Sequence, residues 1–251
     1  MVKNILYICL LAWAFCSCEQ KDSFPYTEKA GLYFFVPDNQ SENPDALKKE
    51  IDFAFAYYQG IDEWGYPTTP YYYGDSLKID TISVIISLLG EISDQPREYY
   101  LKTTPVEELE NLPGNVIFEN PYVFPAGQYL DTIKIAVTRP EKRGEYAIGI
   151  TFDSEDPEGE FESNVADRNV LICKLQNSYP RPDGWNDATS VFGEYSEEKY
   201  AFFVTTLNTI YSRWLEDPWA PPYLNQLQAA LKEYNDAHPD NPKDFTFPGM
   251  N

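Results

Sequence analysis

The sequence DTISVIISLLG, at residues 80–90, sets the fold class of this chain. Every second residue from Ile82 to Leu88 is aliphatic, and the residues between them are mostly small hydroxyl residues. A period of two is typical of a β-strand with one buried face. Gly90 then ends the run as a turn residue. The stretch therefore predicts a strand that covers a hydrophobic core on one side.

The same alternation recurs at residues 51–57, 133–137, 146–152 and 171–175, and shorter apolar runs lie at residues 32–36, 97–102 and 116–118. About eight strands result, separated by turn signals such as Pro113-Gly114 and Arg143-Gly144. Since no helical pattern lies between them, we expect antiparallel pairing. The sequence predicts a mainly β fold, an immunoglobulin-like antiparallel β-sandwich over residues 29–178, without the Cys…Trp…Cys pattern of true immunoglobulin domains.

The pattern becomes helical in the last part of the chain, residues 179–251. Ser196 is a suitable N-cap, with Glu197 and Glu198 in the first turn. Apolar residues at helical spacing continue to Leu215, and Asp217-Pro218 ends the run. A second helix is expected to start at Pro221 and Pro222 and to bury its apolar stripe, which consists of Leu224, Leu227, Leu231 and Tyr234. We expect an α-helical hairpin whose faces meet each other or dock on the sandwich.

The first residues have the features of a lipoprotein signal peptide. Lys3 precedes an apolar run at residues 5–15, which is too short to span a bilayer. The small and polar residues around Cys18 resemble a bacterial lipobox. We therefore expect residues 1–17 to be removed, Cys18 to carry the lipid, and residues 18–28 to form a tether.

The composition excludes some functions. Of 251 residues, 40 are acidic and 19 basic, and the formal net charge of -21 disfavours nucleic-acid binding. His238 is the only histidine, so one chain cannot build a histidine triad or a multi-histidine metal site. Once the signal peptide is removed and Cys18 is lipidated, Cys173 stands alone, and we expect it to be buried. No cofactor and no catalytic activity are expected.

Several motifs together resemble a known family. These are the lipobox, residues 80–90, the strand ending at residues 137–140, residues 192–200, and Phe245-Thr246-Phe247-Pro248. Their order is similar to the Bacteroidetes lipoprotein family known as domain of unknown function 4843. The resemblance implies a cell-envelope lipoprotein, often encoded near glycan-uptake systems with TonB-dependent transporters. It implies no established activity and no catalytic residues.

An aromatic insert at residues 57–73 has no counterpart in that resemblance. It is rich in glycine and proline, which favours a loop or hairpin. Aromatic rings can stack on sugar rings while nearby polar groups bond the hydroxyls. The candidate ligand-binding residues are Trp64, Tyr66, Tyr71, Tyr72 and Tyr73. The alternative is that these rings cover the sheet edge or pack under the helices.

Two weaker patterns concern modification and metal binding. The triplets that start at Asp75, Asp80 and Asp131 resemble a Bacteroidetes O-glycosylation motif, with Ser76, Thr81 and Thr132 as acceptors, although hydroxyl residues also simply begin strands. The acidic loop at residues 153–160 has five carboxylates that suit calcium but lacks EF-hand spacing. A solvated turn is the favoured interpretation, so no metal site is assigned.

These observations predict a non-catalytic lipoprotein of the outer membrane, at the cell surface rather than the periplasmic face. It is expected to bind a polysaccharide or to assist a TonB-dependent transporter complex. The alternative is a structural or assembly lipoprotein that binds a transporter or a fimbrial protein. A hydrolase that uses only carboxylates is a third, weaker option.

Overall fold

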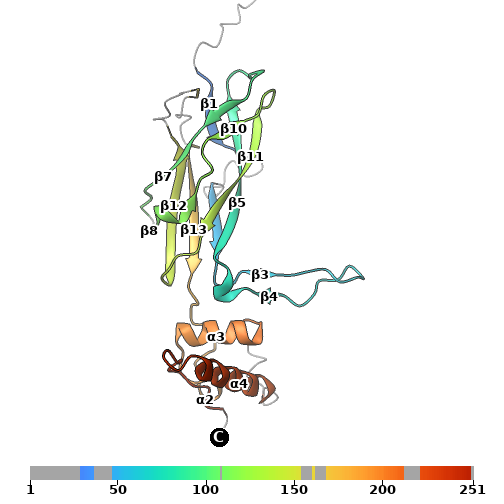
Figure 1. The fold of residues 1–251 in the computed structure, drawn as a ribbon, viewed down its shortest axis with the longest axis vertical. Coiled ribbons are helices and arrows are strands. Elements are labelled where there is room, and N and C mark those ends of the chain that lie inside the picture. Colours follow the sequence, from blue (N-terminus) through green and yellow to red (C-terminus); the bar gives the residue numbers. More distant parts are fainter. Residues whose placement is uncertain are drawn as a thin grey trace, which may run out of the picture.

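The computed structural model describes residues 29–36, 47–107, 109–153, 160–161, 168–211 and 221–249. Two sheets form a β-sandwich, and a helical unit lies at one end of it (Figure 1). The first sheet has the order β1-β5-β11-β9, with bounds Gly31–Phe34, Ile79–Leu89, Leu130–Thr138 and Val116–Ile117. All of its pairs are antiparallel.

The second sheet has the order β2-β13-β12-β7, with bounds Lys48–Asp52, Val170–Asn177, Gly144–Phe152 and Leu101–Thr104. β8 (Glu110–Asn111) also pairs with β12. The β13–β2 and β12–β8 pairs are parallel, so the expectation of purely antiparallel pairing is wrong at these two places. β2 and β13 both run toward the helical unit, since Phe55 follows β2, Tyr179 follows β13 and both side chains pack against that unit, so the two strands pair in parallel.

The described residues also contain two small strand pairs and two 3-10 turns. β6 (Arg97–Tyr99) pairs with β10 (Tyr122–Phe124), and β3 (Tyr57–Tyr58) pairs with β4 (Tyr71–Tyr72). The turns are η2 (Gly74–Ser76) and η3 (Pro113–Asn115).

The inner faces of both sheets bury one core, which confirms the predicted β-sandwich. The alternating residues of β5, β11, β12 and β13 supply most of it, including Ile82, Val84, Ile86, Ile135, Val137, Ile148, Ile150, Leu171 and Leu175. Cys173 lies in this core as a free thiol, as predicted. Burial raises the pKa of that thiol to about 12.

The strand predicted at residues 51–57 is shorter in the structure. β2 ends at Asp52 because this side chain accepts hydrogen bonds from the backbone N–H groups of Ala54 and Phe55, both at 2.9 Å. Such an aspartate turn competes with strand pairing. The chain therefore leaves the sheet after Asp52, and Phe55 packs on the helical unit instead.

Among the described residues, three helices form the helical unit: α2 (Thr189–Phe192), α3 (Glu197–Leu207) and α4 (Pro221–Ala237). Ser196 caps α3 as predicted, since its Oγ accepts from the backbone N–H of Lys199 at 3.2 Å. The prediction that this helix continues to Leu215 is wrong. It ends at Leu207, because Asn208 adopts a left-handed conformation with φ 54°.

The predicted helix stop at residues 217–218 lies outside the described residues. α2 was not expected from the sequence. No described helix is both long and apolar enough to cross a bilayer.

A second core, separate from that of the sandwich, holds the helical unit together. It gathers Trp185, Phe192, Tyr200, Phe203, Val204, Tyr211, Leu227, Leu231 and Phe247. The second core extends to the end of the sandwich through Phe55, Tyr72 and Tyr179. The helical unit is therefore packed on the sandwich and not merely linked to it.

The start of β1 and the helical unit lie at opposite ends of the sandwich (Figure 1). Gly31 pairs with Leu89 at the far end of β5, whereas Ile79, at its near end, follows η2 beside the helices. β5 has 11 residues, so these ends are roughly 33 Å apart at about 3.3 Å per residue. The sandwich thus separates the beginning of the described chain from its helical end.

Candidate functional site

Residues 57–73 form a narrow hairpin that projects sideways from the molecule, and we call it the aromatic arm (Figure 1). Three residues near its tip are among the most exposed large hydrophobic residues: Trp64 is 76% exposed, Ile61 74% and Tyr66 69%. Solvent-exposed aromatic and aliphatic side chains that gather in one place are typical of interaction surfaces. The arm is therefore the candidate binding site.

The tip of the arm is held by a local hydrogen-bond network. The carboxylate of Asp62 accepts from the backbone N–H groups of Trp64 at 2.9 Å and Tyr66 at 2.8 Å. Gly65 sits between them with φ 85°, a value that favours glycine. The backbones of Ile61 and Pro67 form a bridge just behind the tip. The arm thus presents its two aromatic tip residues on an ordered turn.

The base of the arm is clamped by the end of α3. The side chain of Asn208 accepts from the backbone N–H of Tyr72 at 2.7 Å and donates to the carbonyl of Pro70. Tyr72 packs against the second core, as the alternative interpretation expected, and Tyr73 is half-buried. The structure therefore places Trp64 and Tyr66 at the tip and Tyr71, Tyr72 and Tyr73 at the base, with Tyr71 exposed.

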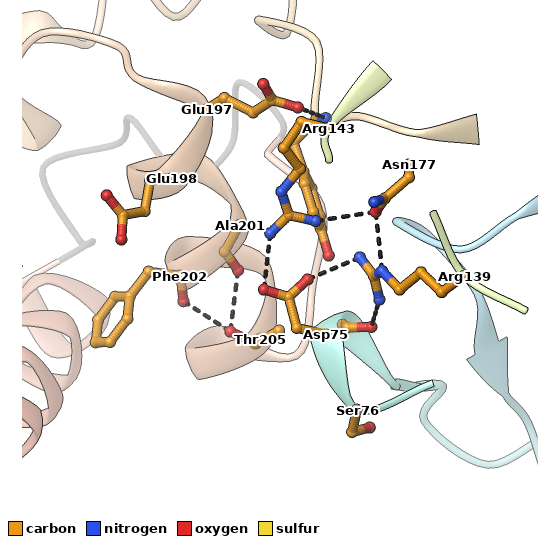
Figure 2. Close-up of polar contacts among 12 residues, drawn as sticks. Asp75, Ser76, Arg139, Arg143, Asn177, Glu197, Glu198, Ala201, Phe202 and Thr205 are labelled. Atoms are coloured by element: carbon orange, nitrogen blue, oxygen red, sulfur yellow. Dashed lines mark hydrogen bonds and ion pairs between the residues drawn. The ribbon is translucent and has the colours of Figure 1, made fainter. Parts of the chain in front are cut away.

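A charged network fixes the turn from which the arm returns to the sandwich (Figure 2). Arg139 and Arg143 each donate to one oxygen of Asp75, both at 2.7 Å. Both guanidinium groups also donate to the side-chain oxygen of Asn177, at 2.9 and 3.1 Å. Arg139, whose side chain is only 7% exposed, donates further to the carbonyl of Gly74. The network joins η2, the β11–β12 turn and the end of β13.

The stability that this network contributes depends on pH through the carboxylate of Asp75. Burial disfavours its charged form, but the hydrogen bond and charge of Arg143, with the charges of Arg139 and Lys78, outweigh burial and hold the pKa of Asp75 below its ordinary value of 3.8. A lowered pKa in the folded state contributes stability above the unfolded pKa, and that contribution is lost as the pH falls through the folded pKa.

We therefore expect Asp75→Asn to lower the free energy of unfolding at pH 7 and to flatten its fall below about pH 4. Urea denaturation at pH 7, 4 and 3 would measure both effects. Asp236→Asn is the control, because it breaks only the exposed Lys232–Asp236 pair and should change stability by less than about 0.5 kcal/mol. The expectation is contradicted if the free energy of unfolding depends on pH in the same way for Asp75→Asn and for the wild type.

The three predicted glycosylation acceptors are all exposed. Ser76 lies in η2 and donates to the carbonyl of Tyr73 at 2.6 Å. Thr81 and Thr132 lie on the outer face of the first sheet, and each backbone N–H donates to the preceding aspartate, at 2.7 and 2.8 Å. The structure thus brings two of the three acceptors to one face of the sandwich.

Other candidate positions lie partly or wholly outside the described residues. Cys18 and residues 154–159 of the acidic loop are among them. At the edges of that loop, Asp153 pairs with Lys102 at 2.7 Å, and Glu160 accepts from the backbone N–H of Glu98 at 2.9 Å. Among the described residues, no three acidic, histidine or cysteine side chains are grouped closely enough to hold a metal ion.

Local sequence patterns do not identify the residues that position the arm. Arg139 and Arg143 stand in a strand end and a turn signal, and neither is predicted as a positioning residue, because their partners Asp75 and Asn177 are 34 to 68 positions away in the chain. Asn208 was assigned to the interior of a helix. The local signal is the residue type, because asparagine is one of the few residues that adopt the left-handed conformation that ends a helix.

The fold and the arm define the class of this protein: a β-sandwich with a docked helical unit and a projecting aromatic hairpin. The chain belongs to the family described as Domain of unknown function (DUF4843), whose model matches residues 26–209. The matched region includes the sandwich, the arm and α3, and it ends before α4. No curated protein matched the chain.

Proposed function

We propose that this protein is a non-catalytic lipoprotein of the bacterial cell envelope that binds a polysaccharide with its aromatic arm. The exposure of Trp64 and Tyr66 on an ordered tip is the observation that carries the proposal. Aromatic rings offer flat apolar faces to sugar rings, and Glu63, which directly precedes Trp64, offers a hydrogen-bond acceptor. Such an arm can contact a polysaccharide chain at a position away from the ends of that chain.

The lipid anchor of the proposal rests on the lipobox at Cys18, and the Bacteroidetes origin rests on the resemblance of several motifs. The positions of the two ends support an outward-facing arm. Since β1 begins at the end of the sandwich away from the helices, an anchor on the preceding segment would hold the helical unit and the arm away from the membrane. This arrangement suits the outer face of the outer membrane and an accessory role beside a TonB-dependent transporter.

Retention on a panel of immobilised polysaccharides tests the arm. We expect the double variant Trp64→Ala/Tyr66→Ala to lose about tenfold or more in affinity, which corresponds to about 1.4 kcal/mol shared by two lost aromatic contacts. Tyr129→Ala is the matched control, because Tyr129 is 61% exposed but lies outside the arm. The proposal fails if the double variant keeps full affinity for every polysaccharide that the wild type retains, or if the wild type retains none.

A second candidate function is the binding of a protein partner, such as a transporter or a fimbrial subunit. Ile61 favours it, because an exposed aliphatic side chain beside two aromatic ones resembles the centre of a protein interface. Pull-down from detergent-solubilised membranes separates the two functions. A stoichiometric partner that is lost with Trp64→Ala/Tyr66→Ala, without polysaccharide retention, would favour the protein partner.

A further inference from the structure

A groove of about 690 Å³ lies between the sandwich and the helical unit. Asp75 and Arg143 line it from the sandwich, and α3 lines it with Glu197, Glu198 and Phe202 (Figure 2). Tyr234 of α4 and Lys243 complete it. The volume is within the range of about 300–1,000 Å³ that small-molecule sites occupy. Five separate segments of the chain thus converge on one groove.

The charged groups of the groove are already paired within the protein. Arg143 bonds Asp75 at 2.7 Å, and Lys243 forms an ion pair with Glu198. Glu197 accepts from the backbone N–H of Tyr179 at 2.8 Å. Each of these groups still presents hydrogen-bonding capacity to a ligand, because a carboxylate accepts several bonds and a guanidinium or ammonium donates several.

The groove also has an apolar surface. The rings of Phe202 and Tyr234 meet edge to face with centroids 6.5 Å apart. Ala201 and Thr205 extend this surface along α3. The groove therefore combines aromatic carbon, donors and acceptors within a short distance, which is the combination that a sugar requires.

Other ligand classes fit this lining less well. An anion would meet three carboxylates, on Asp75, Glu197 and Glu198, against two cations that are already paired. A metal ion lacks a site, because no three such carboxylates are grouped closely enough among the described residues. A wholly apolar ligand would remove water from the ion pairs without replacing its hydrogen bonds. A neutral ligand with many hydroxyl groups is not repelled by the carboxylates and needs no cluster of metal ligands. It can also replace the hydrogen bonds of the water that it displaces.

We propose that this groove is a binding site for a neutral sugar, distinct from the aromatic arm. The hydroxyls of the sugar would donate to the carboxylates and accept from Arg143 and Lys243, while its apolar face lies on Phe202. Tyr234 lines the groove with its edge, because His238 stacks on its ring and Lys243 lies over it. This site does not depend on the arm, so either can fail without the other.

Calorimetric titration with two neutral disaccharides, cellobiose and maltose, tests the groove, with glucuronate and inorganic phosphate as charged probes. We expect at least one disaccharide to bind to both the wild type and Trp64→Ala/Tyr66→Ala, and the charged probes to bind at least tenfold more weakly. Glu198→Trp places an indole at the mouth of the groove and should reduce the affinity at least tenfold. Glu233→Trp is the control, because Glu233 is exposed on α4 and does not line the groove.

Sugar-induced amide shifts in the wild-type protein give a second readout that needs no variant. They should centre on Ala201, Phe202 and Thr205 of α3. The proposal is overturned if neither disaccharide binds, if glucuronate or phosphate binds more tightly, if Glu198→Trp keeps full affinity, or if the shifts lie only on the arm. Loss of binding in Trp64→Ala/Tyr66→Ala with an intact groove would likewise assign the sugar to the arm and not to the groove.

Discussion

Replacement of Trp185 by alanine is expected to lower the free energy of unfolding of the helical unit by about 3–5 kcal/mol. This side chain is only 1% exposed, and five aromatic rings surround it at centroid distances of 5.3–6.1 Å. Its indole N–H also donates to the carbonyl of Gly193 at 3.1 Å, so the variant leaves both a cavity and a lost hydrogen bond. No other side chain makes as many ring contacts among the described residues.

Guanidinium denaturation, followed by far-ultraviolet circular dichroism, measures this effect. Because the sandwich has its own core, the helical signal should disappear at lower denaturant than the strand signal in Trp185→Ala. Trp64→Ala is the matched control: it removes the same side chain from an exposed position and should change stability by less than about 0.5 kcal/mol. Equal losses in both variants would show that the second core does not depend on Trp185.

Gly74→Ala is expected to displace the arm from the helical unit. Gly74 has φ +53°, and an added Cβ would lie 2.1 Å from Cγ2 of Thr205, far inside van der Waals contact. The left-handed conformation alone costs an alanine roughly 1–2 kcal/mol, and overpacking typically adds about 1–3 kcal/mol. We therefore expect a loss of about 2–5 kcal/mol in the free energy of unfolding, with a shift of Asn208 resonances.

The double variant Gly74→Ala/Thr205→Ser separates the two causes. Serine lacks Cγ2 and keeps the hydroxyl that donates to the carbonyl of Ala201, and the next nearest atom, Cβ of residue 205, is at an ordinary 3.5 Å. The double variant should regain the stability that Gly74→Ala loses through overpacking, but not the stability that it loses through the left-handed backbone conformation. No recovery, or a Gly74→Ala protein as stable as the wild type, would contradict the close approach of η2 and α3.

The sequence predicted those parts of the fold that depend on local pattern. The alternation at Ile82–Leu88 placed a half-buried strand correctly, because one-sided burial imposes a period of two. Ser196 placed the start of α3, because capping is decided within four residues. The apolar stripe of α4 likewise predicted which residues would face the second core, with Leu227 and Leu231 buried.

The two errors in element ends have different causes, a distant contact at Asn208 and a local one at Asp52. Asn208 ends α3 while it bonds Pro70 and Tyr72, more than 130 positions earlier, and no local pattern carries that information. Asp52 ends β2 through its own side chain, a local cause that the strict apolar alternation around it concealed. For the candidate site, the sequence identified the aromatic residues of the arm but not their division between tip and base, since that division depends on the clamp at Asn208.

The directions of the edge strands have a mechanical consequence. β1 runs antiparallel to β5, β2 runs parallel to β13, and the chain enters at one end and passes to the helices at the other. Tension between the two ends therefore acts along the strands. It loads all the hydrogen bonds of the five-residue β2–β13 pair in shear at once, and likewise those of the β1–β5 pair. Bonds loaded side by side must break together, whereas a hairpin pulled from its open end unzips one bond at a time. The sandwich is thus suited to serve as a stiff stalk under a pulling force.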